Sequence, residues 1–199
     1  MKRKLIGVSG YARSGKDTFF ERCKIHLEKE GKKCIRFAFA DALKSEVDPL
    51  LSKHVGISAF TEKDVEKEVI RPLLVTYGTD IRRKLNPNCW IETIQSDVIK
   101  YLNKGYYVFI TDVRFENEAH WIKLNGGSMV NIERLGVLPA NHEEHRQKVL
   151  MKKHFNYKIV WPTFGQDSID KCDEHVVPNL SHIVSLFNTE RQKDYNQVL

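Results

Sequence analysis

Long hydrophobic runs, internal repeats and low-complexity stretches are all missing from this sequence of 199 residues. No apolar run approaches the length that crosses a membrane, and Met1 to Lys4 lead into a short apolar run rather than a signal sequence. We therefore expect no membrane partner and a cytoplasmic location. With 41% hydrophobic and 29% charged residues, the composition is typical of a globular protein with one core, so we expect a single domain over residues 1–199.

Paired cysteine and histidine spacings are also missing. The four cysteines show no paired spacing, which favours reduced thiols in the cytosol. The segment His142-Glu143-Glu144-His145 is one residue short of the H-E-x-x-H pattern, so its imidazoles are misplaced for a zinc-protease helix. These absences argue against a disulfide framework and against a zinc site.

A concentrated basic tract is missing too, although the net charge is +6. A positive balance indicates either binding to nucleic-acid phosphates or a cleft for small polyanionic substrates. The lysines and arginines are spread along the chain, so we favour the second interpretation. It predicts small-molecule substrates and no nucleic-acid partner.

The most informative stretch that is present is IGVSGYARSGKDT, residues 6–18. A short apolar strand leads into a glycine-rich loop, and an amphipathic helix follows with Phe20, Cys23 and Leu27 at helical spacing. The pattern GxxxxGK is complete. Its glycines allow backbone N–H groups to point inward, and Lys16 is placed to reach the β- and γ-phosphates of a nucleotide. Asp17 stands where Ser or Thr usually holds magnesium.

The rest of the chain alternates between strands and helices. Residues 34–39, 106–111, 129–132 and 157–161 are expected as further strands, and residues 106–111 form a nearly continuous apolar run. Residues 42–104 are expected to be helical, with breaks at 78–80 and 86–88, and a final helix is expected over 178–188. Residues 136–153 turn polar without an apolar period, which suits a lid or a surface loop. This alternation predicts an α/β fold with a parallel sheet.

Charged residues follow two of these strands. In an open α/β sheet, ligands bind beyond the carboxyl ends of the strands. Asp41 and Lys44 are therefore placed for substrate, and Asp41 could equally be a helix N-cap, or serve as both. Asp112 ends a buried strand and is the magnesium candidate. No glutamate stands beside it to activate water, which favours a kinase over an ATPase.

Arginines gather in the middle of the chain. Guanidinium groups bind phosphate through two parallel hydrogen bonds and stay charged. Arg114 lies two residues after Asp112 and is the strongest candidate for a phosphate ligand. Arg71, Arg82 and Arg83 are consistent both with phosphate binding and with ordinary solvated helix residues.

Together these residues resemble the bacteriophage deoxynucleoside monophosphate kinases, a branch of the P-loop nucleoside monophosphate kinases. The resemblance covers roughly residues 4–134. A motif match is a hypothesis, and the strand, loop and helix expected around the GxxxxGK pattern support it. It rests on SGKDT at 14–18, FADALK at 39–44, Arg71 with Gly78-Thr79 and Trp90, and TDVRFENE at 111–118. It implies ATP-dependent phosphorylation of deoxynucleoside monophosphates, with ATP and Mg²⁺ at the site. For a phage protein the location would be the cytoplasm of the host cell. A homodimer and a monomer both remain alternatives.

The resemblance and the patterns above give one set of expected site residues. The ATP-binding residues are Gly10, Arg13, Ser14, Gly15, Lys16, Asp17 and Thr18. The substrate-binding residues are Asp41, Lys44, Arg71, Gly78, Thr79, Arg83, Trp90, Arg114 and Glu118. The catalytic residues are Lys16, Arg71, Asp112 and Arg114, and the metal ligands are Asp17 and Asp112.

The predicted architecture is a three-layer α/β/α P-loop fold with about five parallel strands. A helical acceptor-binding insertion is expected at about 42–104 and a short lid at about 136–153. Two other classes remain as alternatives. One is another small-molecule P-loop kinase, such as the animal-type phosphomevalonate kinase, which the Gly-Lys-Asp step also resembles. The other is a nucleic-acid-stimulated P-loop ATPase.

Overall fold

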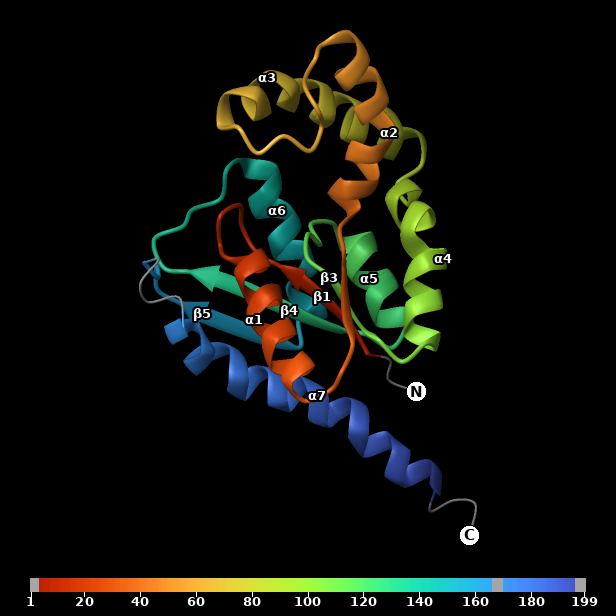
Figure 1. The fold of residues 1–199 in the computed structure, drawn as a ribbon, viewed down its shortest axis with the longest axis vertical. Coiled ribbons are helices and arrows are strands. Elements are labelled where there is room, and N and C mark those ends of the chain that lie inside the picture. The colour runs from red at the N-terminus through yellow and green to blue at the C-terminus, as the bar shows by residue number, and fades with distance from the viewer. Residues whose placement is uncertain (1–3, 166–169, 196–199) are drawn as a thin grey trace. The chain divides into compact units, whose positions relative to one another are not determined.

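Strands and helices alternate along most of the chain (Figure 1). The computed structural model describes residues 4–165 and 170–195, with side chains as far as residue 184. The strands are β1 (Leu5–Ser9), β2 (Cys34–Phe37), β3 (Tyr107–Ile110), β4 (Ser128–Arg134) and β5 (Tyr157–Trp161). The helices are α1 (Lys16–Lys29), α2 (Phe39–His54), α3 (Asp64–Val75), the π-helix η1 (Thr76–Arg83), α4 (Cys89–Asn103), α5 (Glu116–Leu124), α6 (His142–Met151), the 3-10 helix η2 (Lys152–His154) and α7 (Asp173–Tyr195).

The five strands form one parallel sheet in the order β2-β3-β1-β4-β5. The strand that leads into the glycine-rich loop, β1, lies in the centre and is buried along its whole length. This arrangement confirms the predicted α/β class and the parallel sheet of five strands. It also places the loop after β1 between the carboxyl ends of β3 and β4, where ligands bind in sheets of this type.

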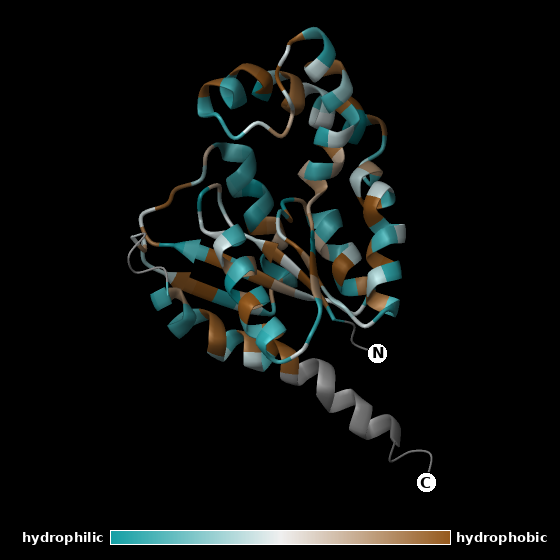
Figure 2. Ribbon diagram, viewed as in Figure 1, coloured by the Kyte–Doolittle hydropathy of each residue, from teal (hydrophilic) through white to brown (hydrophobic). Residues whose placement is uncertain are grey.

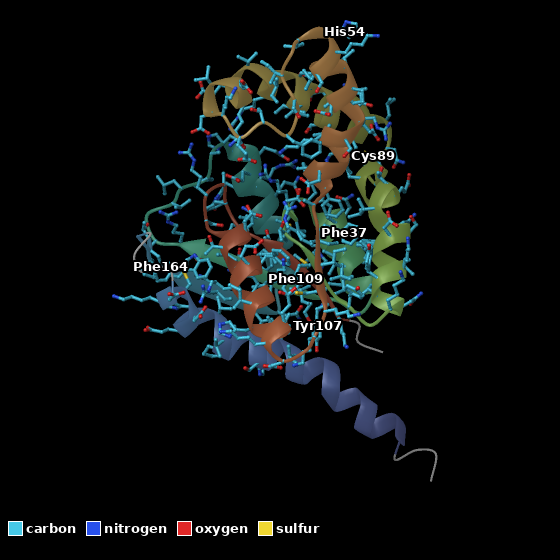
Figure 3. The ribbon with its side chains drawn as sticks, viewed as in Figure 1. Phe37, His54, Cys89, Tyr107, Phe109 and Phe164 are labelled. Atoms are coloured by element: carbon cyan, nitrogen blue, oxygen red, sulfur yellow. The ribbon has the colours of Figure 1, made fainter. Side chains whose placement is uncertain are left out.

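Alternating side chains give the sheet two buried faces. Ile6 and Val8 pack in one cluster with residues of α1 and α7, and Tyr107 and Phe109 of β3, labelled in Figure 3, belong to the same cluster. On the opposite face, a Cβ on Gly7 would lie 2.5 Å from the Ile122 side chain of α5, so this glycine allows the close approach of that helix. In Figure 2 the helices α1, α4 and α5 carry both hydrophobic and hydrophilic residues along their length, as expected for helices with one buried side.

The chain divides into two compact units. The sheet unit comprises residues 1–37 and 98–199, and the helical unit comprises residues 38–97, so α4 contributes to both. The helical unit has its own small core, which includes Val47, Leu51, Ala59 and Ile70. It overlaps the helical segment expected at about 42–104, whose last residues, 98–104, belong to the sheet unit. Among the residues that the structure describes, no helix is long and apolar enough to cross a membrane.

Two element boundaries differ from the sequence prediction. Strand β2 ends at Phe37 and α2 begins at Phe39, so Asp41 lies in the first turn of α2, and the N-cap position belongs to Ala38. The break expected at residues 78–80 is wrong, because these residues continue α3 as the π-helix η1. Gly78 is tolerated there because it is buried against Leu43, where a Cβ would lie 2.8 Å from Leu43 Cδ2. The glycine signals close packing rather than a helix end.

Residues 136–153, expected to be a lid or a surface loop, contain the helix α6. Its first turn is capped by Asn141, whose side-chain oxygen accepts the N–H of Glu144 at 2.8 Å. The ion pair between Arg146 and Glu143, at 2.8 Å, adds support on the solvent side. Of the residues in α6 only Met151 is buried, so no apolar period marked the helix. The final helix also begins earlier than expected, at Asp173, with Pro178 inside it.

An ion-pair cluster fastens α7 to α1. Arg22 Nε and Arg22 Nη2 both donate to Asp173, with the Nε bond at 2.7 Å, and His26 Nε2 lies 2.9 Å from the same carboxylate. Hydrogen bonding to Arg22 lowers the pKa of Asp173 to about 2. A lowered native pKa means that the pair stabilises the fold above the ordinary carboxyl pKa and that this contribution is lost as the pH falls towards 2.

We expect Asp173→Asn to lower the free energy of unfolding by up to about 2 kcal/mol at pH 7. The difference between the variant and the unmodified protein should shrink between about pH 4 and pH 2, as Asp173 becomes protonated in both the folded and unfolded states. Urea unfolding followed by circular dichroism at several pH values measures it. A difference that stays constant across this pH range would contradict the contribution of the ionised Asp173 carboxylate to stability.

Candidate active site

The loop after β1 is shaped by backbone conformations that suit glycine. Gly15 has a φ of 90° and Gly10 a φ of 153°, and Arg13 takes a positive φ of 63°. A Cβ on Gly10 would lie 2.4 Å from the carbonyl oxygen of Ile132 in β4. Such conformations and contacts favour glycine strongly. The loop therefore curls tightly between β1 and α1, as the glycine pattern predicts, and the N-terminus of α1 begins at Lys16.

Lys16 is folded onto the loop that precedes it. Its side chain is buried, and Nζ donates to the carbonyl oxygens of Gly10 at 3.0 Å and Tyr11 at 2.9 Å. Burial and, to a smaller extent, the nearby Arg114 cation lower the pKa of Lys16 to about 8, although the carboxylates Asp17, Glu144 and Asp112 act in the opposite direction. Arg114, Asp17 and Asp112 therefore each lie within electrostatic range of Lys16.

Trp161 of β5 packs against the glycine-rich loop, and the sequence analysis did not predict this role. Its Nε1–H donates to the carbonyl oxygen of Ser14 at 2.9 Å, and a Cβ on Gly15 would lie 2.8 Å from Trp161 Cζ2. The ring is 2% exposed. Ser14 Oγ is buried and finds no hydrogen-bond partner within the part of the chain that is described, and its predicted contact with ATP stays a prediction.

The two predicted metal ligands are carboxylates at the start of α1 and after β3. Asp17 is exposed in the first turn of α1, 3.7 Å from Arg36 Nε, and Asp112 is half-buried. Both lie near enough to Lys16 to affect its pKa. Magnesium takes one or two carboxylates and completes its shell with water and substrate phosphates, so this donor set fits it. Within residues 4–165 and 170–195, no group of three or more His, Cys, Asp or Glu is arranged to hold a metal ion.

The turn from Asp112 to α5 is held by a buried carboxylate. Glu118 is fully buried, and its Oε2 accepts the backbone N–H groups of Arg114 at 2.8 Å and Phe115 at 3.0 Å. The Arg114 side chain itself is exposed. Glu118 therefore positions the backbone that carries Arg114, which is a supporting function the sequence did not indicate. Its predicted contact with substrate stays a prediction.

Two predicted acceptor residues in the helical unit contact each other. Trp90 is 2% exposed, and its Nε1–H donates to the carbonyl oxygen of Gly78 at 3.3 Å. The guanidinium of Arg82 lies over the Trp90 ring at 5.3 Å and also pairs with Glu46 at 3.1 Å. Arg82 and Trp90 therefore serve the packing of this unit. The predicted contact of Trp90 with the acceptor stays a prediction, and it requires the ring to be uncovered first.

The other predicted acceptor residues differ in exposure. Arg71 on α3 and Thr79 on η1 are exposed, and Arg83 is half-buried near the end of η1. Asp41 and Lys44 are half-buried on α2, with Lys44 Nζ lying 5.5 Å from the centre of the Phe60 ring. The π-helix thus carries Gly78, Thr79 and Arg83 together, and π-helical segments occur frequently at functional sites.

Comparison with curated proteins gives viral relatives, and no model of a known protein family matches the chain. A protein of Acanthamoeba polyphaga mimivirus named "Putative deoxynucleotide monophosphate kinase" is 28% identical over 174 residues, which cover 78% of this chain and 86% of that protein. Two uncharacterised proteins of Ictalurid herpesvirus 1 (strain Auburn), ORF76 and ORF77, are 25% and 32% identical over 143 and 97 residues.

These herpesvirus matches cover 71% and 48% of this chain but only 53% and 42% of the two proteins, so the chain matches about half of their length. The likeness found is to viral proteins and is not specific to bacteriophages. Among solved structures, the crystal structure of TT1252 from Thermus thermophilus aligns with 90% of this chain and 99% of that one, at 12% identity and a TM-score of 0.46. A score of this size carries no conclusion about function.

Proposed function

We propose that this protein transfers the γ-phosphoryl group of ATP to a deoxynucleoside monophosphate. The observation that carries the proposal is the glycine-rich loop after the central strand, with Lys16 and Arg114 in electrostatic range of each other beside it. The likeness to the mimivirus protein, which extends over most of both chains, supports a nucleotide-kinase-like function. Phosphoryl transfer is catalysed mainly by positioning and by charge stabilisation, and those are the means that these residues offer.

In this proposal the loop amides and the N-terminus of α1 hold the ATP phosphates. Lys16 turns from the carbonyls of Gly10 and Tyr11 towards the β- and γ-phosphates, and Arg114 neutralises charge on the transferring group. Asp17 and Asp112 would hold Mg²⁺, which neutralises phosphate charge when bound. The acceptor phosphate is already largely ionised at neutral pH, so its oxygen attacks without a general base.

We assign the acceptor to the helical unit. Arg71, Thr79 and Arg83 offer two guanidinium groups and a hydroxyl for the acceptor phosphate and sugar, and Asp41 and Lys44 lie on the adjacent helix α2. Arginine suits this task because its planar fork binds phosphate through two hydrogen bonds.

A substrate panel tests the proposal. ATP and magnesium are combined with each deoxy- and ribonucleoside monophosphate, with phosphomevalonate, and with single- or double-stranded DNA, and ADP production is measured. We expect a deoxynucleoside monophosphate to give the highest rate and DNA to give no stimulation. A higher rate with phosphomevalonate would reassign the acceptor, and a DNA-dependent rate above the monophosphate-dependent rate would indicate a nucleic-acid-stimulated ATPase.

Arg114→Lys should lower turnover by roughly 10- to 150-fold, because a charged hydrogen bond is worth about 1.5–3 kcal/mol and lysine cannot reproduce the bidentate contact. The side chain is exposed, so the melting temperature should not change. Steady-state kinetics and thermal unfolding of the same preparation separate the two effects. Turnover within about twofold of the unmodified enzyme would show that Arg114 is not a phosphate ligand, since that corresponds to about 0.4 kcal/mol.

Asp17→Asn should raise the magnesium concentration needed for half-maximal activity and lower turnover. The exposed ion pair with Arg36, at 3.7 Å, contributes little to stability, and asparagine is tolerated at a helix start, so the melting temperature should stay the same. A magnesium titration of the initial rate measures the effect, and Asp17→Ser should retain more activity than Asp17→Ala. An unchanged magnesium requirement would leave Asp112 as the sole protein ligand in this proposal.

A further inference from the structure

Helix α6 is fastened to the glycine-rich loop by a carboxylate. Glu144 Oε1 accepts the backbone N–H of Ala12, in the middle of the loop, at 3.0 Å. The other oxygen, Oε2, accepts the N–H of Ala140, just before α6, at 2.7 Å. One side chain thus bridges the loop and the segment that leads into the helix, and it does so across 132 residues of sequence.

A second set of contacts joins α6 to the neighbouring loop residue. The hydroxyl of Tyr11 lies 2.9 Å from His145 Nδ1, and Lys148 Nζ lies 4.0 Å from the centre of the Tyr11 ring. Lys148 is held in turn by Glu133 of β4 at 3.0 Å. Residues 144, 145 and 148 all lie within α6, so the helix grips two successive loop residues, Tyr11 and Ala12.

In the same loop, the lysine is also held by groups of the chain itself. Lys16 Nζ is turned back onto the carbonyls of Gly10 and Tyr11, and the Glu144 carboxylate raises the pKa of Lys16. A carboxylate on a loop N–H is the same kind of interaction as a phosphate oxygen on that N–H, an anion accepting a charge-assisted hydrogen bond. The backbone amide of Ala12 cannot serve both at full strength.

We propose that Glu144 is an internal competitor of the nucleotide: it occupies the Ala12 amide in the resting protein and latches α6 to the loop. The inference rests on the proposed use of the loop as a nucleotide phosphate site. Because the carboxylate and the phosphate exclude each other at the Ala12 amide, nucleotide binding releases α6. The latch in turn lowers nucleotide affinity by the same factor by which a bound nucleotide weakens the contact between α6 and the loop. The arrangement makes α6 a switch that reports whether the loop is filled.

The test compares binding of ATP, and separately of inorganic tripolyphosphate, by isothermal titration calorimetry. The unmodified protein is measured beside Glu144→Ala, Glu144→Gln and a matched control, Glu143→Gln. Glu143 carries the same charge one residue away but pairs with Arg146 and Gln147 instead of the loop. We expect Glu144→Ala to bind both ligands about tenfold more tightly, Glu144→Gln about threefold, and Glu143→Gln with unchanged affinity, since a charged acceptor roughly doubles the strength of a hydrogen bond.

Hydrogen exchange gives an independent readout. On addition of ATP to the unmodified protein, the Ala140 amide, which donates to Glu144, should lose protection, and this loss should be absent in Glu144→Ala, where the amide exchanges quickly from the start. If Glu144→Ala does not fold by circular dichroism, the isosteric Glu144→Gln carries the test alone.

The possible failures are distinct. Unchanged or weaker affinity in the folded Glu144 variants, or equal tightening in Glu143→Gln, overturns the latch while the phosphate loop stands. Absence of ATP and tripolyphosphate binding in every protein, including the unmodified one, overturns the proposed function and the latch with it.

Discussion

Replacing Lys16 by methionine is expected to abolish nearly all phosphoryl transfer without unfolding the protein. One charged donor at a transferring group is worth about 3–5 kcal/mol of transition-state stabilisation, which corresponds to two to four powers of ten in rate. The side chain is buried, and burial lowers its pKa to about 8, so the fold gains nothing from the charge at this position. Methionine fills a similar volume without that desolvation cost.

Single-turnover rates with ATP and the best acceptor from the substrate panel measure the loss, and thermal unfolding provides the stability control. The pH dependence provides a further check. If ATP binds the protonated Lys16, its affinity for the unmodified protein should fall as the pH rises through about 8, and this fall should vanish in Lys16→Met. Near-normal turnover in the variant would remove the basis for the phosphate-loop assignment.

Replacing Trp161 by alanine should lower the free energy of unfolding by about 3–5 kcal/mol, the usual cost of removing a large buried aromatic side chain. The ring is 2% exposed and meets Phe19 and Phe164 edge-on, with centroid distances of 6.5 and 5.8 Å. Phe164 is labelled in Figure 3. Denaturant unfolding measures this cost, and a loss below about 1 kcal/mol would show that the site repacks without the ring.

The matched variant Trp161→Phe separates packing from loop support. Phenylalanine keeps an aromatic ring but removes the Nε1–H that donates to Ser14, a bond worth about 0.5–1.5 kcal/mol. We expect a small loss of stability together with severalfold weaker ATP binding, because the Ser14 carbonyl is no longer anchored and the loop amides lose their fixed direction. ATP affinity equal to that of the unmodified protein would show that the loop does not depend on this bond.

Local patterns predicted the parts of the molecule that local physics controls. The apolar strand followed by GxxxxGK identified β1, the loop and the start of α1, because strand, glycine conformation and helix start are all encoded by neighbouring residues. The break at residues 86–88 was also correct, since α4 begins at Cys89 after Pro87. The helix break expected at Gly78 was wrong because the backbone preference of glycine acts locally. The close packing of Gly78 against Leu43 depends on the tertiary structure.

The sequence alone determined the parallel α/β sheet, the glycine-rich loop after its first strand, and the two carboxylates and the arginine that lie near Lys16. These features follow from the succession of strands along the chain and from the residues at the strand ends. Only the tertiary structure decided that Trp161 anchors Ser14, that Glu118 holds the turn of Arg114 and that Glu144 occupies the Ala12 amide. Trp161 and Glu144 come from β5 and α6, more than 130 residues after the loop residues that they bind. The periodicity of a local stretch of sequence cannot predict a hydrogen bond that forms only when the sheet and its helices have packed.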